Sequence, residues 1–418
     1  MECGICSSNS FFEVRLFENM KFYRKEFSMA TIFKPANSSN VVTNSVQSHT
    51  IPEDGSTRNY LNFSRSSSER YLYINYPETI IPTTNCFANA GSSQGGNRHL
   101  FQTTLAANET VQLFFSHHNQ SSKSINYAIL IWNPNSSNTT ATVTATNIGY
   151  AYGWNVAEFS PWVDFYNGTP LSVPVSGQSS QFLLDWRNIP TSAGPSIAAP
   201  PFSGIMRITS DWAVTLTVYM WHGSDVSVIG GDESQYPYNV NEAGNQYDND
   251  PAAKFTGVGA GYYLMASNTV TTVAASGNGM YYSLASCASG NTNEIIPITL
   301  SGAANTVASQ NASFPLNNLG NWGAQYHFNT TLDNSSSPVA KTFKCYIGRN
   351  PSEGKFVIKY GTNVSYCSIG ATTSTLGTAY KWNFLDVTVP AYSRETVSFQ
   401  LSHATCSSAP IYLQWKTE

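Results

Sequence analysis

The chain has 418 residues, of which 21 are Lys or Arg and 25 are Asp or Glu, so 11% are charged against roughly 25% in an average soluble protein. The formal net charge is −4 and the few basic residues are scattered. This argues against a nucleic-acid-binding protein, because such proteins need clustered Lys and Arg to displace counterions from phosphates. No apolar run approaches the roughly 18 residues of a membrane-spanning helix, and the aromatic content of 13% predicts a large buried core.

Residues 1–28 differ in composition from the rest of the chain. They lack the apolar core and the small-residue cleavage site of a secretory signal, so no signal peptide is recognised. A second start-like sequence follows at Met29, and either Met1 or Met29 fits the true start. We expect an unstructured extension here, because the segment is dense in charge: Glu2, Glu13, Arg15, Glu18, Lys21, Arg24, Lys25 and Glu26.

Residues 29–58 are rich in Ser, Asn and Thr. Segments of this composition usually form loops or extended connections. We therefore predict an extended N-terminal arm over this range.

From about Asn59 to residue 225, short segments of period two with β-branched and aromatic residues predict a first β-sandwich domain. Residues 125–132 and 139–146 are the clearest pair, and the Asn, Pro and Ser residues at 133–138 supply turn geometry between them. This pattern predicts a β-hairpin. Helical periodicity is nearly absent.

Aromatic side chains are concentrated at 150–166, where Gly153 and Pro161 interrupt regular structure. In a connecting loop, such rings can stack on sugars while nearby carboxylates and amides bond the hydroxyls. The alternative is that large rings cap the open end of the core. The candidate glycan-binding residues are Tyr152, Trp154, Trp162, Asp164 and Tyr166.

Residues 226–255 are polar, rich in Gly and Asn, and form the most acidic stretch. Oxygen ligands from an irregular loop are those that calcium prefers, although EF-hand spacing is missing. We predict an interdomain linker here, with a weak calcium site as an additional hypothesis. The candidate ligands are Asp232, Glu233, Asp248 and Asp250.

Strand patterns resume after the linker and predict a second sandwich over 256–418. The predicted fold is therefore all-β, with two tandem antiparallel β-sandwich domains of jelly-roll or immunoglobulin-like type behind an extended arm. The strands expected in this half are 269–275, 295–300, 325–332, 341–347, 355–360, 384–390, 395–402 and 410–415.

Seven cysteines at long, irregular spacing leave the disulfide state open. Cys345 could pair with Cys367 and Cys287 with Cys406, or the thiols are free. The sequence holds no metalloprotease, nucleophile-elbow or phosphate-loop motif, so we expect no cofactor apart from the weak calcium site.

The segment Arg70-Tyr-Leu-Tyr-Ile-Asn-Tyr-Pro-Glu-Thr79 and the strand pair at 109–146 resemble β-sandwich exoproteins of spore-forming bacteria, whose function is uncertain. The resemblance covers about a third of the chain and brings no catalytic motif. It implies an extracellular or spore-surface location. A spore-surface protein needs no signal peptide because it is made inside the mother cell.

We favour a non-enzymatic structural or assembly protein of an extracellular or spore surface layer or appendage. The first alternative is a carbohydrate-binding adhesion module anchored on Trp154 and Trp162. A glycan-active enzyme is another, and it needs a carboxylate pair such as Asp164 and Asp185 about 5–10 Å apart. The last is a virion surface protein, which is also made without a signal.

Low charge also predicts self-association, because little electrostatic repulsion keeps copies apart. The predicted strands 139–146 and 395–402 carry one charged residue between them, Glu395, whereas edge charges usually prevent strand-to-strand pairing. We expect the arm at 30–58 to add a strand to a neighbour's sheet.

Overall fold

The computed structural model describes residues 30–36, 49–50, 59–65, 69–75, 79–80, 98–121, 123–154, 156–191, 200–221, 256–277, 279–285, 294, 296, 298–299, 321–349, 354–369, 378–404 and 411–418. The predicted extension 1–28 and the predicted linker 226–255 lie outside these residues, as does most of the arm. Strands dominate the described part, which confirms an all-β sandwich architecture. None of the described helices combines the length and the apolar character needed to cross a bilayer.

The first sandwich packs two sheets face to face around one apolar cluster. Its smaller sheet has four described strands in the order β11-β8-β13-β6: β6 (Arg98–Leu105), β8 (Ile125–Asn133), β11 (Ser179–Ile189) and β13 (Val214–Trp221). The eight-stranded sheet has the order β10-β9-β12-β7-β4-β14-β17, with β5 beside β7: β4 (Arg70–Ile74), β5 (Thr79–Ile80), β7 (Thr110–Asn119), β9 (Thr140–Tyr152), β10 (Leu171–Ser176), β12 (Pro201–Ser210), β14 (Thr256–Ala260) and β17 (Ile298–Thr299).

The second sandwich consists of two six-stranded sheets. The arm sheet has the order β1-β22-β19-β24-β16, with β2 also paired to β22: β1 (Ala30–Phe33), β2 (His49–Thr50), β16 (Met280–Leu284), β19 (Lys341–Arg349), β22 (Thr378–Val389) and β24 (Ile411–Thr417). The helix-side sheet has the order β21-β20-β23-β18-β15-β3: β3 (Ser64–Arg65), β15 (Tyr263–Thr271), β18 (Gln325–Asp333), β20 (Gly354–Tyr360), β21 (Asn363–Ile369) and β23 (Arg394–His403). Most neighbours are antiparallel, but β15 runs parallel to β18.

The alternation of side chains explains the strands that are buried on one face, of which β9 is an example. In β9, Ala141, Val143 and Ala145 are fully buried, while the threonines between them face outward. One face of the strand is thus removed from water and the other keeps its hydroxyl groups solvated.

The predicted hairpin at 125–146 is wrong in its pairing, although both strands exist. β8 pairs with β11 and β13, whereas β9 pairs with β10 and β12, so the turn carries the chain from one sheet to the other. The buried Asn133 side chain holds this corner, because its amide donates to the carbonyls of Thr139 (3.2 Å) and Val175 (2.8 Å). The apolar faces of the two strands therefore meet across the core and not side by side.

A helix occupies most of the predicted aromatic loop. Helix α2 (Val156–Asn167) places Phe159, Trp162 and Tyr166 at helical spacing on its buried face. Gly149 on β9 permits this packing, since an added Cβ would lie 2.0 Å from the carbonyl oxygen of Pro161. The expectation of an irregular segment here is therefore wrong: Pro161 lies inside the helix and does not prevent it.

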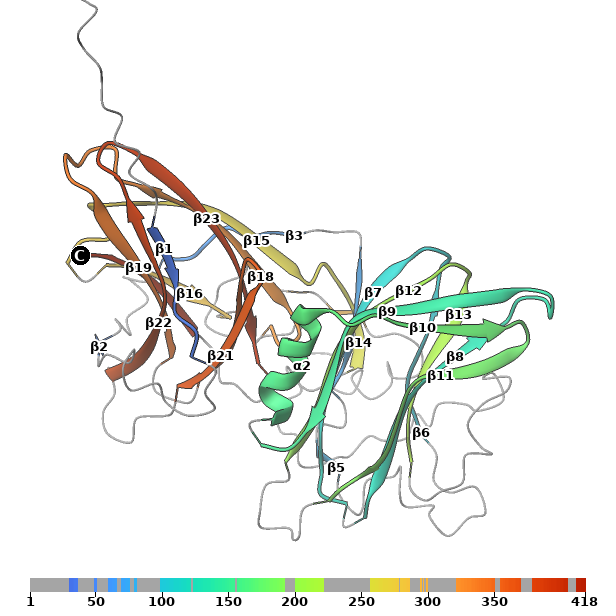
Figure 1. Cartoon of the computed structure of the whole chain (residues 1–418). Coiled ribbons are helices and arrows are strands. Elements are labelled where there is room, and N and C mark those ends of the chain that lie inside the picture. Colours follow the sequence, from blue (N-terminus) through green and yellow to red (C-terminus); the bar gives the residue numbers. More distant parts are fainter. Residues whose placement is uncertain are drawn as a thin grey trace, which may run out of the picture.

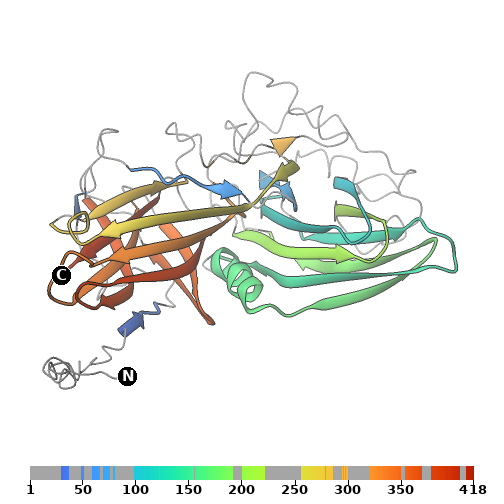
Figure 2. The same cartoon turned by 90° about the horizontal axis from the view of Figure 1, so that it is seen from above.

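The helix lies between the two sandwiches, as Figures 1 and 2 show. It packs against β9 and β12 on one side and against β20 and β21 on the other. A single apolar cluster joins residues of the eight-stranded sheet, the helix and the second sandwich: among them Tyr71, Phe114, Ile205, Trp162, Tyr326 and Phe356. The two sandwiches thus share part of their core.

Strand membership also differs from the predicted ranges 59–225 and 256–418. The N-terminal strands β1, β2 and β3 belong to the second sandwich, while β14 and β17 complete the eight-stranded sheet of the first. The chain crosses between sandwiches at Gly261 and Tyr262, where Gly261 adopts a φ of 70°. Each sandwich therefore contains strands from both halves of the sequence.

Candidate functional site

The edge of the arm sheet is the most distinctive interaction surface among the described residues. There β1 pairs antiparallel with β22, so that Ala30 faces Thr388 and Phe33 faces Leu385. Further along the same strand, His49 and Thr50 of β2 pair with Ala379 and Thr378. Two pieces of the predicted arm thus extend the protein's own sheet.

Contacts beyond the strand pairing fix β1 on both sheets of the second sandwich. The Lys34 ammonium lies 2.5 Å from the Asp386 carboxylate, and the Lys34 amide donates to the Phe384 carbonyl at 2.8 Å. The Phe33 ring stacks on Tyr360 of the helix-side sheet, with ring centres 5.8 Å apart. The Ala36 amide donates to the Ser365 hydroxyl at 2.8 Å. The segment therefore closes one side of the sandwich.

The outer side of β1 is open in the described part of the chain, because β22 is its only strand neighbour there. Its side chains alternate between exposed and half-buried, and Ile32 is 56% exposed. An uncharged edge with an exposed large apolar side chain is a surface that another strand can pair with.

The candidate glycan-binding residues do not form one surface. Trp162 and Tyr166 retain 1% and 5% of their exposure and pack in the core, and burial raises the pKa of Tyr166, although its hydrogen bond with Ser402 opposes this. Asp164 lies on the exposed side of the same helix, and partial desolvation raises its pKa. Sugar stacking on Trp162 or Tyr166 would require the helix to leave the core.

Trp154 is the exposed aromatic residue of this group, with 43% of its surface open. Its ring lies 5.9 Å from the His118 ring on β7. Tyr152 is half-buried against the core of the first sandwich, and burial raises its pKa. A sugar-binding surface in this region would thus centre on Trp154.

The carboxylates named for a glycan-active enzyme belong to different layers. Asp185 lies on β11 of the four-stranded sheet and forms an ion pair with Arg187. Asp164 lies on α2, which packs against β9 and β12 of the opposite sheet. The structure does not bring these two groups together as an acid–base pair.

The metal and disulfide predictions have different outcomes. Asp232, Glu233, Asp248 and Asp250 lie outside the described residues, so the calcium site stays a prediction. Within the described ranges, no group of three or more His, Cys, Asp or Glu side chains could hold a metal ion. Cys345 and Cys367 are buried and are not joined to each other by a disulfide bond.

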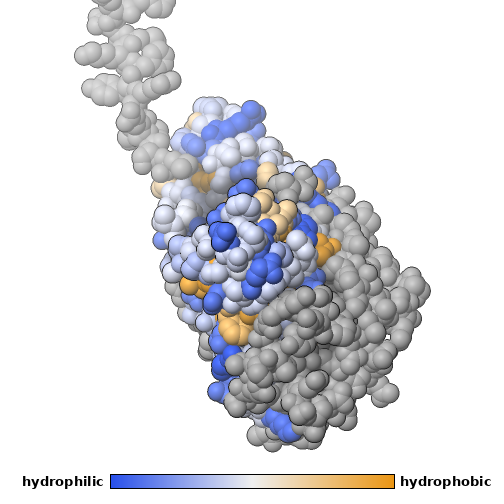
Figure 3. Space-filling view, turned by 90° about the vertical axis from the view of Figure 1, so that its right-hand side faces the viewer, coloured by the Kyte–Doolittle hydropathy of each residue, from blue (hydrophilic) through white to orange (hydrophobic). Residues whose placement is uncertain are grey.

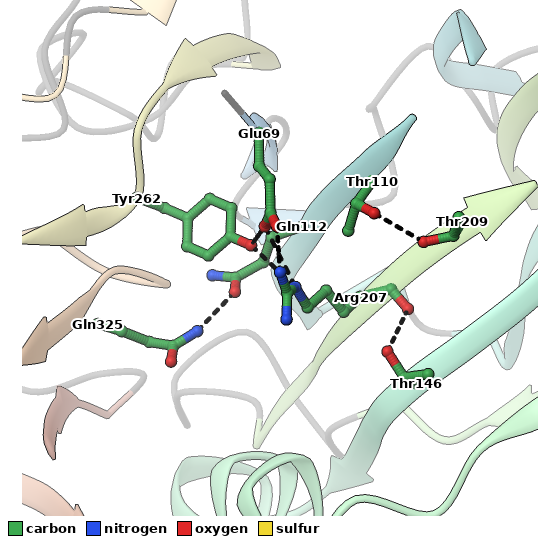
Figure 4. A network of polar contacts seen from close by, with 8 residues as sticks. All are labelled: Glu69, Thr110, Gln112, Thr146, Arg207, Thr209, Tyr262 and Gln325. Atoms are coloured by element: carbon green, nitrogen blue, oxygen red, sulfur yellow. Dashed lines mark hydrogen bonds and ion pairs between the residues drawn. The ribbon is translucent and has the colours of Figure 1, made fainter. Parts of the chain in front are cut away.

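A polar network connects the two sandwiches close to the chain crossing (Figure 4). Arg207 on β12 donates to both carboxylate oxygens of Glu69, and the Tyr262 hydroxyl donates to the same carboxylate. Burial lowers the arginine pKa, but the hydrogen bond with Glu69 and the electrostatic contributions of Tyr262, Tyr263 and Glu69 together outweigh it, so that the pKa is raised. Nearby, Gln325 donates to Gln112 at 2.7 Å. The charges are satisfied internally, so this network orients the sandwiches and offers no vacant catalytic group.

A buried ion pair lies beneath the helix. Lys355 on β20 contacts Glu158 on α2, and their side chains are 5% and 0% exposed. Sequence reasoning missed both residues, because 197 positions separate them. The available signal was one charge within Val156-Ala-Glu-Phe159 and one at the start of the apolar run Lys355-Phe-Val-Ile358.

No protein-family model and no curated protein sequence matches this chain. Among solved structures, a 7S globulin from Momordica charantia is 10% identical, with 85% of this chain and 82% of that chain covered and a TM-score of 0.15. The CUB1-EGF-CUB2 domain of human MASP-1/3 is 9% identical, with 76% and 99% covered and a TM-score of 0.16. An oxalate decarboxylase formate complex from Lactobacillus farciminis is 11% identical, with 75% of each chain covered and a TM-score of 0.11. Similarities this weak carry no argument about function.

Proposed function

We propose that this protein is a non-enzymatic structural component that self-associates into an extracellular, spore or particle surface layer. The observation that carries the proposal is the sheet edge at β1 and β22. An N-terminal segment is already added there as a strand, and its outer side is open among the described residues. Assemblies built by strand addition use this kind of edge.

The uncharged polar side chains on the outward faces of the sheets support the same proposal. On the eight-stranded sheet, the hydroxyls of Thr110 and Thr209 lie 2.9 Å apart, and those of Thr144 and Ser172 lie 3.0 Å apart. Residues of intermediate hydropathy, drawn pale, cover much of the coloured surface in Figure 3. A face of this kind, on a chain with a net charge of −4, offers little repulsion between copies.

The resemblance to exoproteins of spore-forming bacteria supports placing the protein at a spore or extracellular surface. A virion surface is the alternative location. Immunogold labelling of intact spores or particles from the source organism distinguishes them, and labelling confined to the cell interior would contradict both.

Sedimentation velocity and electron microscopy of the full-length chain test self-association. We expect concentration-dependent oligomers at tens of micromolar, with sheets or filaments at higher concentration. A single monomeric species over the whole concentration range would refute the proposal.

Glycan binding at Trp154 is a second candidate, favoured by the exposed indole beside His118. We expect a glycan array to identify ligands whose binding is lost in Trp154→Ala. Trp212→Ala is the matched control, because Trp212 is 48% exposed but lies just after β12, outside the aromatic segment. Equal binding by the two variants would exclude Trp154 as the anchor.

A further inference from the structure

The contacts of β1 form a set that is separable from the remainder of the fold. Among the described residues, 30–36 make four strand pairs, one ion pair, one ring contact and the two amide hydrogen bonds of Lys34 and Ala36, and Phe33 and Ala36 also pack against the shared apolar cluster. The partners in these strand pairs, ion pair, ring contact and hydrogen bonds all lie between Tyr360 and Thr388, and the Ala36 bond spans 329 positions. The same surface can therefore accept an identical segment from another chain without any change in its own structure.

The strength of this attachment is modest. Lys34 is 35% exposed in its ion pair with Asp386, and ion pairs near the surface contribute about 0–1 kcal/mol. Phe33 is half-buried, and Ala30 and Ile32 are exposed. Release of β1 thus gives up four strand pairs and the packing of Phe33 and Ala36, and leaves the fully buried residues of both sandwiches in place.

We propose that β1 is exchanged between copies of this chain, so that β1 of one copy pairs with β22 of a second copy in the same register. This inference rests on the proposed self-association and identifies its contact. The strand makes the same contacts in both arrangements. The equilibrium between β1 paired within its own chain and β1 paired with a second copy is therefore set by protein concentration and by the chain that connects β1 to the body.

The chain that connects β1 to β2 sets how far β1 can reach. Twelve residues, 37–48, separate Ala36 from β2, and twelve residues of extended chain span at most about 40 Å. Reciprocal exchange gives a closed dimer, whereas donation in one direction gives an open chain of copies. The second arrangement would produce filaments.

The ion pair between Lys34 and Asp386 provides a direct test. Full-length protein is prepared with natural nitrogen and with nitrogen-15, mixed at low concentration and then concentrated, and native mass spectrometry verifies that mixed oligomers form. A carbodiimide then couples Lys34 to Asp386, which lie 2.5 Å apart. We expect cross-linked peptides in which one partner is light and the other heavy.

A second ion pair supplies the internal control. Lys344 on β19 contacts Glu418, and both belong to the body of the arm sheet. Their cross-link should contain a single isotope in every case. If mixed oligomers form but the Lys34–Asp386 peptides also carry a single isotope, exchange is overturned while the proposed function stands. If no oligomers form, both are overturned.

Removal of the strand gives an independent measurement. Deletion of residues 1–36 should weaken self-association at least tenfold in sedimentation velocity, whereas deletion of residues 1–28 should leave it unchanged. Equal association of both truncated chains would refute exchange and would direct attention to other sheet edges, such as β10.

Discussion

Buried charge at the sandwich interface is the most informative feature at the scale of single residues. Glu158 and Lys355 lose their hydration together, and their mutual attraction offsets this cost only while both are present. The pair therefore makes correct docking of α2 on β20 a condition for stability, and a local error in that docking would leave a charge in the core.

We predict that Glu158→Gln lowers the free energy of unfolding by about 3–5 kcal/mol, because the Lys355 ammonium then stays buried without its carboxylate. The double variant Glu158→Gln/Lys355→Met should recover a large part of the loss. Asp185→Asn, which breaks the exposed pair with Arg187, is the control and should cost about 0–1 kcal/mol. Denaturant unfolding measures these variants together with the single variant Lys355→Met, and additive effects of the two buried substitutions would contradict the coupling.

We predict that His327 makes the free energy of unfolding depend on pH. Burial, with a smaller contribution from the Lys359 ammonium, lowers its pKa from 6.5 to about 4. The unfolded chain therefore takes up this proton first as the pH falls. The stabilising contribution of neutral His327 is complete above pH 6.5 and is lost as the pH falls towards 4.

The full effect corresponds to about 3 kcal/mol. We expect the unfolding free energy of the natural protein, measured relative to His327→Gln, to decrease between pH 6.5 and pH 4. The variant keeps every other titrating group, so the carboxylates cancel in the comparison. A difference that is constant over this interval would show that His327 is not desolvated.

At the scale of elements, the sequence predicts strands well and their partners poorly. Alternation locates β18 and β23 to within a few residues, because each buries mainly one face and the period of two is local, whereas β8 is buried on both faces and its continuous apolar run locates it. Pairing is decided by surfaces that meet only in three dimensions. The turn at 133–138 has the composition of a hairpin turn, yet Asn133 makes it a corner between sheets.

Helix α2 was missed for a related reason. Its apolar spacing is helical, but Gly153 and Pro161 suggest an interrupted segment, and the aromatic residues fit a capping loop equally well. The tertiary environment decides, since both sandwiches present apolar surface to the same side chains. The candidate sugar-binding rings at Trp162 and Tyr166 were thus taken from a core element.

We predict that Trp162→Ala lowers the free energy of unfolding far more than Trp154→Ala does, although the residues are only eight positions apart. Trp162→Ala removes a buried ring between the sandwiches and should cost about 3–5 kcal/mol of unfolding free energy. Trp154→Ala changes a surface side chain and should stay within about 0.5 kcal/mol. Thermal and denaturant unfolding measure both. Equal losses would show that Trp162 does not contribute more to the core than the surface residue Trp154 does.

At the scale of the whole molecule, each sandwich contains strands from both halves of the sequence, and this determines how the protein can be divided. A chain cut within 226–255 leaves β1, β2 and β3 on the N-terminal piece and β14 and β17 on the C-terminal piece. When the two pieces are separated, each lacks strands of its own sandwich and exposes part of the shared cluster around Trp162 and Tyr326. The segment 226–255 therefore does not divide the chain into two pieces that each contain a complete sandwich.

We predict that the fragments 1–225 and 256–418 fail to fold when they are produced separately but assemble when they are co-expressed. An affinity tag on one fragment should recover the other, and the near-ultraviolet circular dichroism of the pair should match that of the intact chain. The control is a full-length chain with a protease site inside 226–255, folded first and then cut, whose pieces should remain together in gel filtration. The opposite outcome is two fragments that are each monomeric and unfold in separate cooperative transitions that add up to that of the intact protein. It would show that the shared core and the strands contributed by the other half of the sequence add little, because each sandwich would then be complete without them.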